Sequence, residues 1–170
     1  MKRIACVFVV LIGWACNPKP EPHIHNGIAV MDAAREIMLA GTCSLITVNE
    51  NAQPFARVMD PLDPDADFVV WLATNARSRK LEHIKSNNYV VLHYVDHMDN
   101  GYVSLYGKAE LVRDTIAINE HWKPEWDQFY PNRNADCVLI KVQPVRLEVI
   151  NYRAGITGDP LTWQPEVIMF

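Results

Sequence analysis

The sequence predicts a mainly β fold of the α+β class, in which six or seven antiparallel strands form a small barrel with a few short helices. Apolar runs of strand length alternate with short polar turns along the body of the chain. Two of these turns, residues 49–52 and 99–101, have the composition of hairpin loops, which join antiparallel neighbours. Apolar residues make up 49% of the 170 residues, which is enough for a substantial core.

Residues 1–16 differ in character from the rest of the chain. A positively charged start is followed by an uncharged apolar run that ends at Cys16, too short to cross a membrane and of the length of a signal-peptide core. The following Asn-Pro-Lys-Pro-Glu-Pro cannot continue a helix and indicates an extended tether. We therefore predict a signal peptide over 1–16, a tether over 17–27 and one folded domain over 28–170.

The leader resembles that of a bacterial lipoprotein, with Cys16 as the residue that carries the lipid. Ala15 fits the usual pattern before such a cysteine, whereas Gly13 and Trp14 are unusual there. The alternatives are a plain secretory signal and a mis-assigned start codon. We expect an exported protein, periplasmic or held at a membrane through a lipid anchor only, with a cytoplasmic protein as the alternative.

The net charge indicates that the protein has no nucleic-acid partner, and the positions of the histidines indicate no metal site. The formal net charge is −4 and the basic residues are scattered, so no nucleic-acid partner is expected. His23 and His25 lie in or beside the tether without a third ligand nearby, and we interpret them as solvated, with no metal site. Cys43 and Cys137 each begin a strand-like run and are expected to be buried thiols. A disulfide between them is the alternative in an exported protein.

The first half of the body contains a helix and three strands. Asp32 is a candidate N-cap and Gly41 a candidate stop for a helix over 32–41. Strands are predicted over 44–48, 53–59 and 68–73, and the Pro- and Asp-rich segment 61–67 is predicted to be a loop.

The second half begins with a short helix over 78–84 and continues mainly as strands. Residues 102–112 alternate between polar and apolar side chains, as a strand with one buried face does. Residues 114–130 are expected to be helical and are rich in aromatic side chains, for which packing is the default interpretation and a pocket wall the alternative. The other predictions are strands over 89–95, 138–142 and 145–150, a break at Pro144, and an irregular tail after Tyr152.

The segment from Thr74 to Lys80 carries the clearest functional signal. It follows a predicted strand, precedes a predicted helix, and contains two hydroxyls and three cations in the order Thr-Asn-Ala-Arg-Ser-Arg-Lys. Cations are the wrong charge for the start of a helix unless an anion meets them there. Phosphate binds well to such a combination of free amides, hydroxyls and basic side chains. We therefore predict a phosphate site, with a solvated basic turn as the alternative.

Several segments, taken in order, resemble one known superfamily over about residues 29–150. They are Thr74-Asn75 followed by Ser78-Arg79-Lys80, the strand Pro54–Met59, Asn88 with residues 90–92, Gly107–Glu110, and Pro144 with Glu148. Together they resemble the pyridoxamine-phosphate-oxidase-like, FMN-binding split-barrel superfamily, and the general stress protein branch within it. This resemblance implies a split barrel that forms a homodimer, with FMN bound at the interface by both protomers.

The resemblance also implies roles for individual residues. Arg79 and Lys80 hold the FMN phosphate with help from Arg57 and the Ser78 hydroxyl. Tyr102 stands where the oxidases usually have a glutamine near the flavin ring, and Leu62 stands where they have a lysine. The complete set of implied cofactor-binding residues is Arg57, Val58, Met59, Ala73, Thr74, Ser78, Arg79, Lys80 and Tyr102.

The function implied by the resemblance is an FMN-dependent oxidoreductase that acts on an unidentified small molecule by hydride transfer through flavin N5. No general acid or base stands out in the sequence. In the tail 150–158 Arg153 is the only cation, whereas the oxidases carry an Arg/His cluster there that grips pyridoxamine phosphate, so we do not expect that activity. The alternative is a flavin-binding reservoir or sensor without turnover; deazaflavin and haem are less favoured cofactors.

Overall fold

The computed structural model describes residues 27–170. The predicted signal peptide, nearly all of the predicted tether, Cys16 and the two tether histidines lie outside the described residues. No helix within 27–170 is long and apolar enough to cross a membrane.

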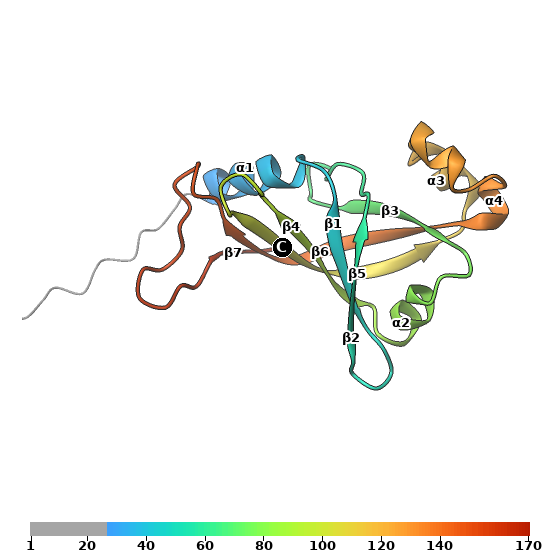
Figure 1. The fold of residues 1–170 in the computed structure, drawn as a ribbon, viewed down its shortest axis with the longest axis horizontal. Coiled ribbons are helices and arrows are strands. Elements are labelled where there is room, and N and C mark those ends of the chain that lie inside the picture. The colour runs from blue at the N-terminus through green and yellow to red at the C-terminus, as the bar shows by residue number, and fades with distance from the viewer. Residues whose placement is uncertain (1–26) are drawn as a thin grey trace, which may run out of the picture.

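One antiparallel sheet forms the body of the molecule (Figure 1). The hydrogen-bonded order is β2-β1-β4-β5-β6-β3, and β7 pairs with the far end of β6. The strands are β1 (Cys43–Val48), β2 (Pro54–Met59), β3 (Val70–Asn75), β4 (Tyr89–Val95), β5 (Tyr102–Val112), β6 (Cys137–Ile150) and β7 (Glu166–Met169). This arrangement confirms the predicted mainly β, α+β split barrel with few helices.

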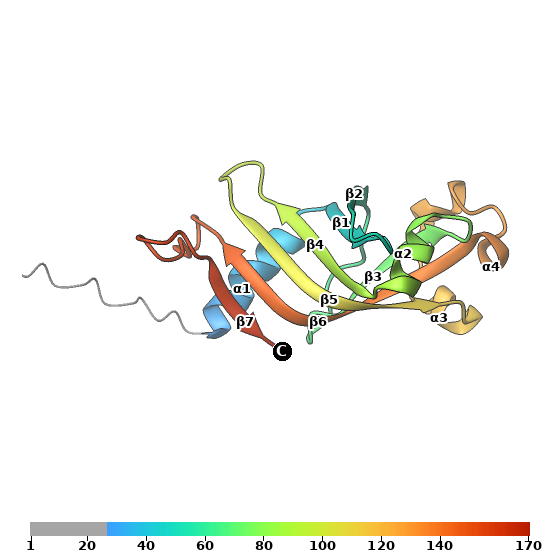
Figure 2. The same cartoon turned by 90° about the horizontal axis from the view of Figure 1, so that it is seen from below.

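The sheet coils without closing. Its two end strands, β2 and β3, do not pair with each other in the described part of the chain. A single bridge between Pro61 and Leu72 connects the loop after β2 to β3. The inner face of the sheet and helix α1 (Gly27–Met38) enclose the main core, and Figure 2 shows α1 crossing the sheet at the end where β7 lies. The open edge between β2 and β3 is therefore free to accommodate a site.

Helix α1 begins earlier than predicted. Its buried side chains are Val30, Ala33, Ala34, Ile37 and Met38, which follow the helical spacing i, i+3, i+4, i+7 and i+8. This apolar stripe starts before Asp32, so the predicted N-cap is wrong and Asp32 lies inside the helix. The short helix α2 (Lys80–Ser86) is displaced by two residues from the predicted range.

Strand β6 runs unbroken through Pro144, where the sequence predicted a break. The pairing register with β5 shifts between Tyr106 and Gly107, next to Pro144. A bulge of this kind accommodates a proline that cannot donate a ladder hydrogen bond. Gly107 is needed there, because a Cβ atom would lie 2.6 Å from the Gln143 carbonyl oxygen. The tail is also more ordered than predicted, since it returns to the sheet as β7.

The segment between β5 and β6 packs at the opposite end of the molecule from β7 (Figures 1 and 2). It contains α3 (Thr115–Glu120), the 3-10 helix η1 (Pro124–Gln128) and α4 (Arg133–Asp136). Asp114 caps α3 by accepting a hydrogen bond of 2.9 Å from the Ala117 amide. Ile118 and Trp126 join Ala73, Cys137 and Leu139 in a second, smaller core.

The two cysteines of the body are free, buried thiols in different cores. The expected buried thiols are thus present, and the alternative disulfide is not formed. Burial raises the pKa of the Cys43 thiol to about 12 and also raises that of Cys137. Neither is a reactive thiolate at neutral pH.

Candidate anion and cofactor site

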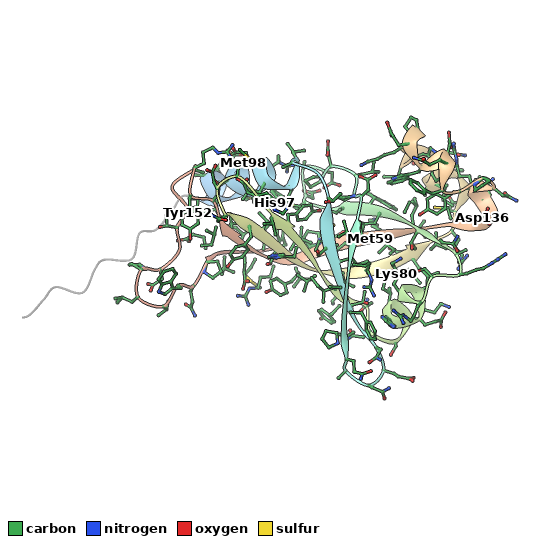
Figure 3. All side chains as sticks on the ribbon, in the orientation of Figure 1. Met59, Lys80, His97, Met98, Asp136 and Tyr152 are labelled. Atoms are coloured by element: carbon green, nitrogen blue, oxygen red, sulfur yellow. The ribbon has the colours of Figure 1, made fainter. Side chains whose placement is uncertain are left out.

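A cleft of about 340 Å³ lies between the two end strands of the sheet. In Figure 3, Met59 at the end of β2 and Lys80 at the start of α2 lie close together at the middle of the molecule. The residues that line the cleft are Val58, Met59, Asp60, Ala73, Thr74, Asn75, Lys80, Trp126, Phe129 and Tyr130. Five of the nine residues predicted to bind a cofactor therefore share one cleft.

Lys80 is held at the floor of this cleft by two hydroxyl groups. Its ammonium nitrogen donates to Thr74 Oγ1 at 2.7 Å and to Ser78 Oγ at 2.8 Å. The turn after β3 brings these groups together, because the Ser78 amide donates to the Asn75 carbonyl at 2.9 Å. Burial, and secondly the charge of Arg57, lower the pKa of Lys80. Neither hydroxyl neutralises this cation.

Arg57 points inward from β2. Its Nη1 atom donates to the Leu45 carbonyl at 3.1 Å and to Thr47 Oγ1 at 2.7 Å, both on the paired strand β1. Its Nη2 and Nε atoms donate to no other residue within 27–170 and remain available to a ligand. Burial, and secondly the charge of Arg79, lower the pKa of Arg57.

Arg79 completes the group of cations. Its guanidinium carbon lies 4.9 Å from the centre of the Phe55 ring, and it also lines a neighbouring cavity of about 250 Å³. Arg57, Arg79 and Lys80 form no ion pair with a carboxylate anywhere in the described part of the chain. Other cations do form such pairs, namely Lys85, Lys123, Arg133, Arg146 and Arg153. Three neighbouring cations without counter-ions in the described part of the chain form a candidate site for an anion.

Side chains, and not the amides of residues 76–78, are the groups that this candidate site offers to an anion. Helix α2 has only seven residues, and Arg79 occupies its N-cap position without a side-chain cap. The Ala76 amide already donates to the Asp136 carbonyl. The amides of Arg77 and Ser78 donate to the side-chain oxygen and to the backbone carbonyl of Asn75, respectively. The predicted contribution of free amides in this turn is therefore wrong for these three positions.

An aromatic wall of Trp126, Phe129 and Tyr130 lines the cleft together with Lys80, and packing was the default prediction for these side chains. Trp126 is buried and donates from Nε1 to Asp60 Oδ2 at 2.8 Å, while Lys123 donates to the other oxygen at 2.6 Å. Phe129 is 63% exposed and presents its ring to solvent. The spacing of the aromatics was visible in the sequence, but only the fold shows that Asp60 and η1 meet at the cleft.

Thr47 and His83 extend the cluster around Arg57, and no pattern in the sequence indicates them. Both are buried, and Thr47 Oγ1 lies 3.0 Å from His83 Nδ1. The His83 ring also packs on Phe55, with 4.7 Å between ring centres. These residues come from β1, β2 and α2, which are separated in the sequence, so no local motif indicates their contact.

Tyr102 lies outside the cleft of its own chain. It is the first residue of β5 and directly follows the hairpin that carries His97 and Met98, which lies apart from Lys80 (Figure 3). Its ring lies 5.5 Å from that of His93, and burial, then Glu148 and Tyr152, raise its pKa. Its predicted contact with a cofactor stays a prediction. Within residues 27–170 no cluster of three or more His, Cys, Asp or Glu side chains could hold a metal ion.

Known proteins of related sequence are oxidases. A pyridoxine/pyridoxamine 5'-phosphate oxidase of Vibrio parahaemolyticus is 28% identical over 115 residues, which is 68% of this chain and 50% of that protein. An enzyme of the same name from Photorhabdus laumondii is 37% identical over 67 residues, 39% of this chain and 30% of that protein. The chain thus spans half or less of the length of these relatives.

Solved structures share the fold at low sequence identity. A Clostridium acetobutylicum protein related to general stress protein 26, of the pyridoxinephosphate oxidase family, superposes with a TM-score of 0.70 and 18% identity over 86% of this chain and 97% of its own. A haem-binding protein of Mycobacterium smegmatis superposes with a TM-score of 0.59 and 15% identity, over 75% of this chain and 55% of its own. An F420 reductase superposes with a TM-score of 0.54 and 22% identity, over 66% of this chain and 94% of its own.

The family profile named "Pyridoxamine 5'-phosphate oxidase like" matches residues 30–153, which is most of the chain and includes both cations of the Ser-Arg-Lys motif. With the split barrel and the cleft at its open edge, the chain belongs to the pyridoxamine 5'-phosphate oxidase-like family.

Proposed function

We propose that the cleft binds FMN and that the protein is a flavin-dependent oxidoreductase acting on a small molecule. The observation that supports this most strongly is a cleft lined by Lys80 and by three aromatic side chains, with two further cations without counter-ions, Arg57 and Arg79, beside Lys80 in the fold. A phosphate ester on a planar ring system has the matching distribution of charge and apolar surface. Arg57 and Arg79 offer planar forks that grip two oxygens at once, and Lys80 offers a point charge.

The chain's own residues would bind and orient the cofactor. Arg57, Arg79, Lys80 and Ser78 would hold its phosphate. The backbone of Val58–Met59 and Ala73–Thr74 would run along its ring and ribityl chain. When bound, FMN supplies the acceptance and return of a hydride at its N5.

The aromatic wall defines where a substrate would sit. Trp126, Phe129 and Tyr130 give the cleft an apolar surface on which a planar ring could pack. Asp60 is fixed by Trp126 and Lys123, so its carboxylate is already engaged rather than free to act as a base. The substrate would therefore be oriented mainly by apolar contact.

Pyridoxamine phosphate is not the substrate that we propose. Arg153, the one cation of the corresponding tail, is surrounded by carboxylates and donates to Asp99, Asp96 and Glu36. A guanidinium neutralised in this way does not attract a substrate phosphate.

We also propose that two copies of the chain build each site. The edge strand β2 leaves Val58 70% exposed beside the cleft, and Tyr102 is half-buried at the start of β5. A second copy of the chain could cover Val58 and bring its own Tyr102 to the cofactor. Export, with a lipid on Cys16, is a further proposal that rests on the leader sequence alone.

The absorbance spectrum of the purified full chain tests the cofactor directly. Bands near those of free flavin support FMN, whereas a haem Soret band or a deazaflavin spectrum would overturn it. Titration of the cofactor-free protein should show FMN binding much more tightly than riboflavin, which lacks the phosphate. Bleaching by a nicotinamide reductant followed by reoxidation supports an enzyme, while bound flavin that never turns over supports the alternative of a reservoir or sensor.

A further inference from the structure

A buried relay of hydrogen bonds leads from helix α2 to the anion site. Arg57 Nη1 donates to Thr47 Oγ1 at 2.7 Å, and the same oxygen lies 3.0 Å from His83 Nδ1. Thr47 is fully buried and His83 is 6% exposed. The three side chains come from β2, β1 and α2, so the relay also ties the helix to the end of the sheet.

The partners of the groups assign a direction to both bonds. A guanidinium can only donate, so the Thr47 oxygen accepts from Arg57. The Thr47 hydroxyl is buried and contacts no other acceptor within residues 27–170, so its hydrogen is assigned to His83, whose Nδ1 then accepts it. His83 is therefore neutral, with its proton on Nε2. A protonated His83 would instead bring a second donor and a second positive charge to the same hydroxyl.

The surroundings of His83 keep it neutral. Burial lowers its pKa, and the charges of Arg57 from β2 and Arg79 from its own helix lower it further. Two carboxylates share its cavity, Glu82 on α2 and Glu50 in the turn after β1, and both are exposed to solvent. Glu82 is engaged with Lys85 at 2.7 Å.

The same ring supports the second arginine. His83 packs on one part of Phe55, and Arg79 lies over the Phe55 ring at 4.9 Å. His83 thus contacts Arg57 through a hydroxyl and Arg79 through an aromatic ring. No other described residue connects to both arginines in this way.

We propose that His83 is a positioning residue of the anion site, which holds Arg57 through Thr47 so that its Nη2 and Nε atoms face a bound phosphate group. This inference rests on the proposed phosphate-binding function of the cleft. It assigns His83 no contact with the ligand: its effect passes through Thr47. Removal of the acceptor at Nδ1 frees the hydroxyl to rotate and weakens one of the two bonds that fix Arg57 Nη1, the other being to the Leu45 carbonyl.

Two pairs of variants test the relay. His83→Leu removes the acceptor at similar volume, whereas His83→Asn places an amide oxygen near the position of Nδ1. Thr47→Val removes the hydroxyl, whereas Thr47→Ser keeps it. We expect the Leu and Val variants to bind a phosphate group about tenfold more weakly, as loss of one hydrogen bond to a charged group implies, and the Asn and Ser variants to approach the wild type.

The measurement uses inorganic phosphate as well as flavins. Thermal stabilisation of the cofactor-free full chain by phosphate, against chloride at equal ionic strength, gives the response of the anion site alone. Titrations with FMN and riboflavin give the selectivity for the phosphate group. Because Thr47 and His83 act in series, the double variant Thr47→Val/His83→Leu should bind phosphate no more weakly than either single variant.

Each outcome supports or overturns the role proposed for His83. Equal phosphate responses and equal FMN-to-riboflavin selectivity in all variants, additive losses in the double variant, or a wild type without a phosphate response would overturn the inference. If phosphate behaves as expected but FMN does not bind, the relay stands and the flavin proposal fails. Should His83→Leu not fold, the Thr47→Val and Thr47→Ser pair still provides the comparison.

Discussion

At the scale of single residues, the three cations for which we propose a binding role carry a cost to the folded state. Arg57, Arg79 and Lys80 repel one another, and burial opposes the charges of Arg57 and Lys80. Interactions of this kind persist in a fold because a ligand completes them. The same residues should therefore be important for binding and unimportant, or unfavourable, for stability.

The double variant Arg79→Ala/Lys80→Ala tests both halves of that statement. Loss of two charge-assisted bonds to a phosphate should weaken FMN binding by about a hundredfold or more. The melting temperature without ligand should stay the same or rise. Lys85→Ala on the same helix, an exposed lysine paired with Glu82, is the matched control and should leave binding unchanged. Unchanged flavin content in the double variant would show that the phosphate lies elsewhere.

The neutral state of His83 predicts a dependence of stability on pH. Its pKa is lowered from the ordinary 6.5, so below pH 6.5 the unfolded chain binds more protons than the folded one. The free energy of unfolding should therefore fall as the pH drops through 6.5 toward the folded pKa, by at most about 1.4 kcal/mol per pH unit for one such group. Urea unfolding at several pH values should show a shallower fall in His83→Asn. Identical pH profiles would mean that His83 does not titrate between the two states.

At the scale of elements, the sequence predicted most strands within two residues, because hairpin turns and alternation are local signals. The fourth and fifth strands match their predicted ranges, whereas the break at Pro144 did not occur. A bulge opposite Gly107 absorbs the proline, and that compensation depends on a partner strand more than thirty residues away. The contact between Asp60 and Trp126 and the relay through Thr47 could not be predicted for the same reason.

The bulge itself can be tested by Gly107→Ala. The added Cβ would lie 2.6 Å from both the Gln143 carbonyl oxygen and Val142 Cγ1, one of which is backbone and cannot move alone. We expect a loss of about 1–3 kcal/mol in the free energy of unfolding. Gly27→Ala, whose Cβ would meet only Ile168 at 3.8 Å, is the control and should cost little. Equal stabilities for both variants in urea unfolding would contradict this role for Gly107.

At the scale of the whole molecule, the position of Tyr102 gives a direct test of a site shared between two chains. Tyr102→Ala and Arg79→Ala/Lys80→Ala should each weaken FMN binding as homodimers. A mixture unfolded and refolded together should contain heterodimers with one intact site, formed by the unaltered cations of one chain and Tyr102 of the other. FMN titration should then detect tight sites that neither parent has. No recovery on mixing would argue for a site confined to one chain.

Fractionation of cells that make the native chain tests the proposed export. The native protein should be found with membranes, and Cys16→Ala should be released into a soluble fraction, since the lipid chains of a lipoprotein anchor it stably. The flavin content of each fraction should be measured in the same experiment. Native protein that stays soluble in the cytoplasm with bound FMN would rule out the lipoprotein reading of the leader.

The unclosed edge between β2 and β3 has a consequence for how such a protein could acquire its cofactor. A chain that crosses a membrane unfolded arrives empty, because the cleft does not exist before folding. In a barrel closed by hydrogen bonds between all neighbouring strands, a ligand that arrives after folding would have to break some of these bonds to enter. Here the cleft is lined by the ends of two strands that do not pair with each other. We therefore expect the empty chain to complete its fold first and then to bind the cofactor through this open edge.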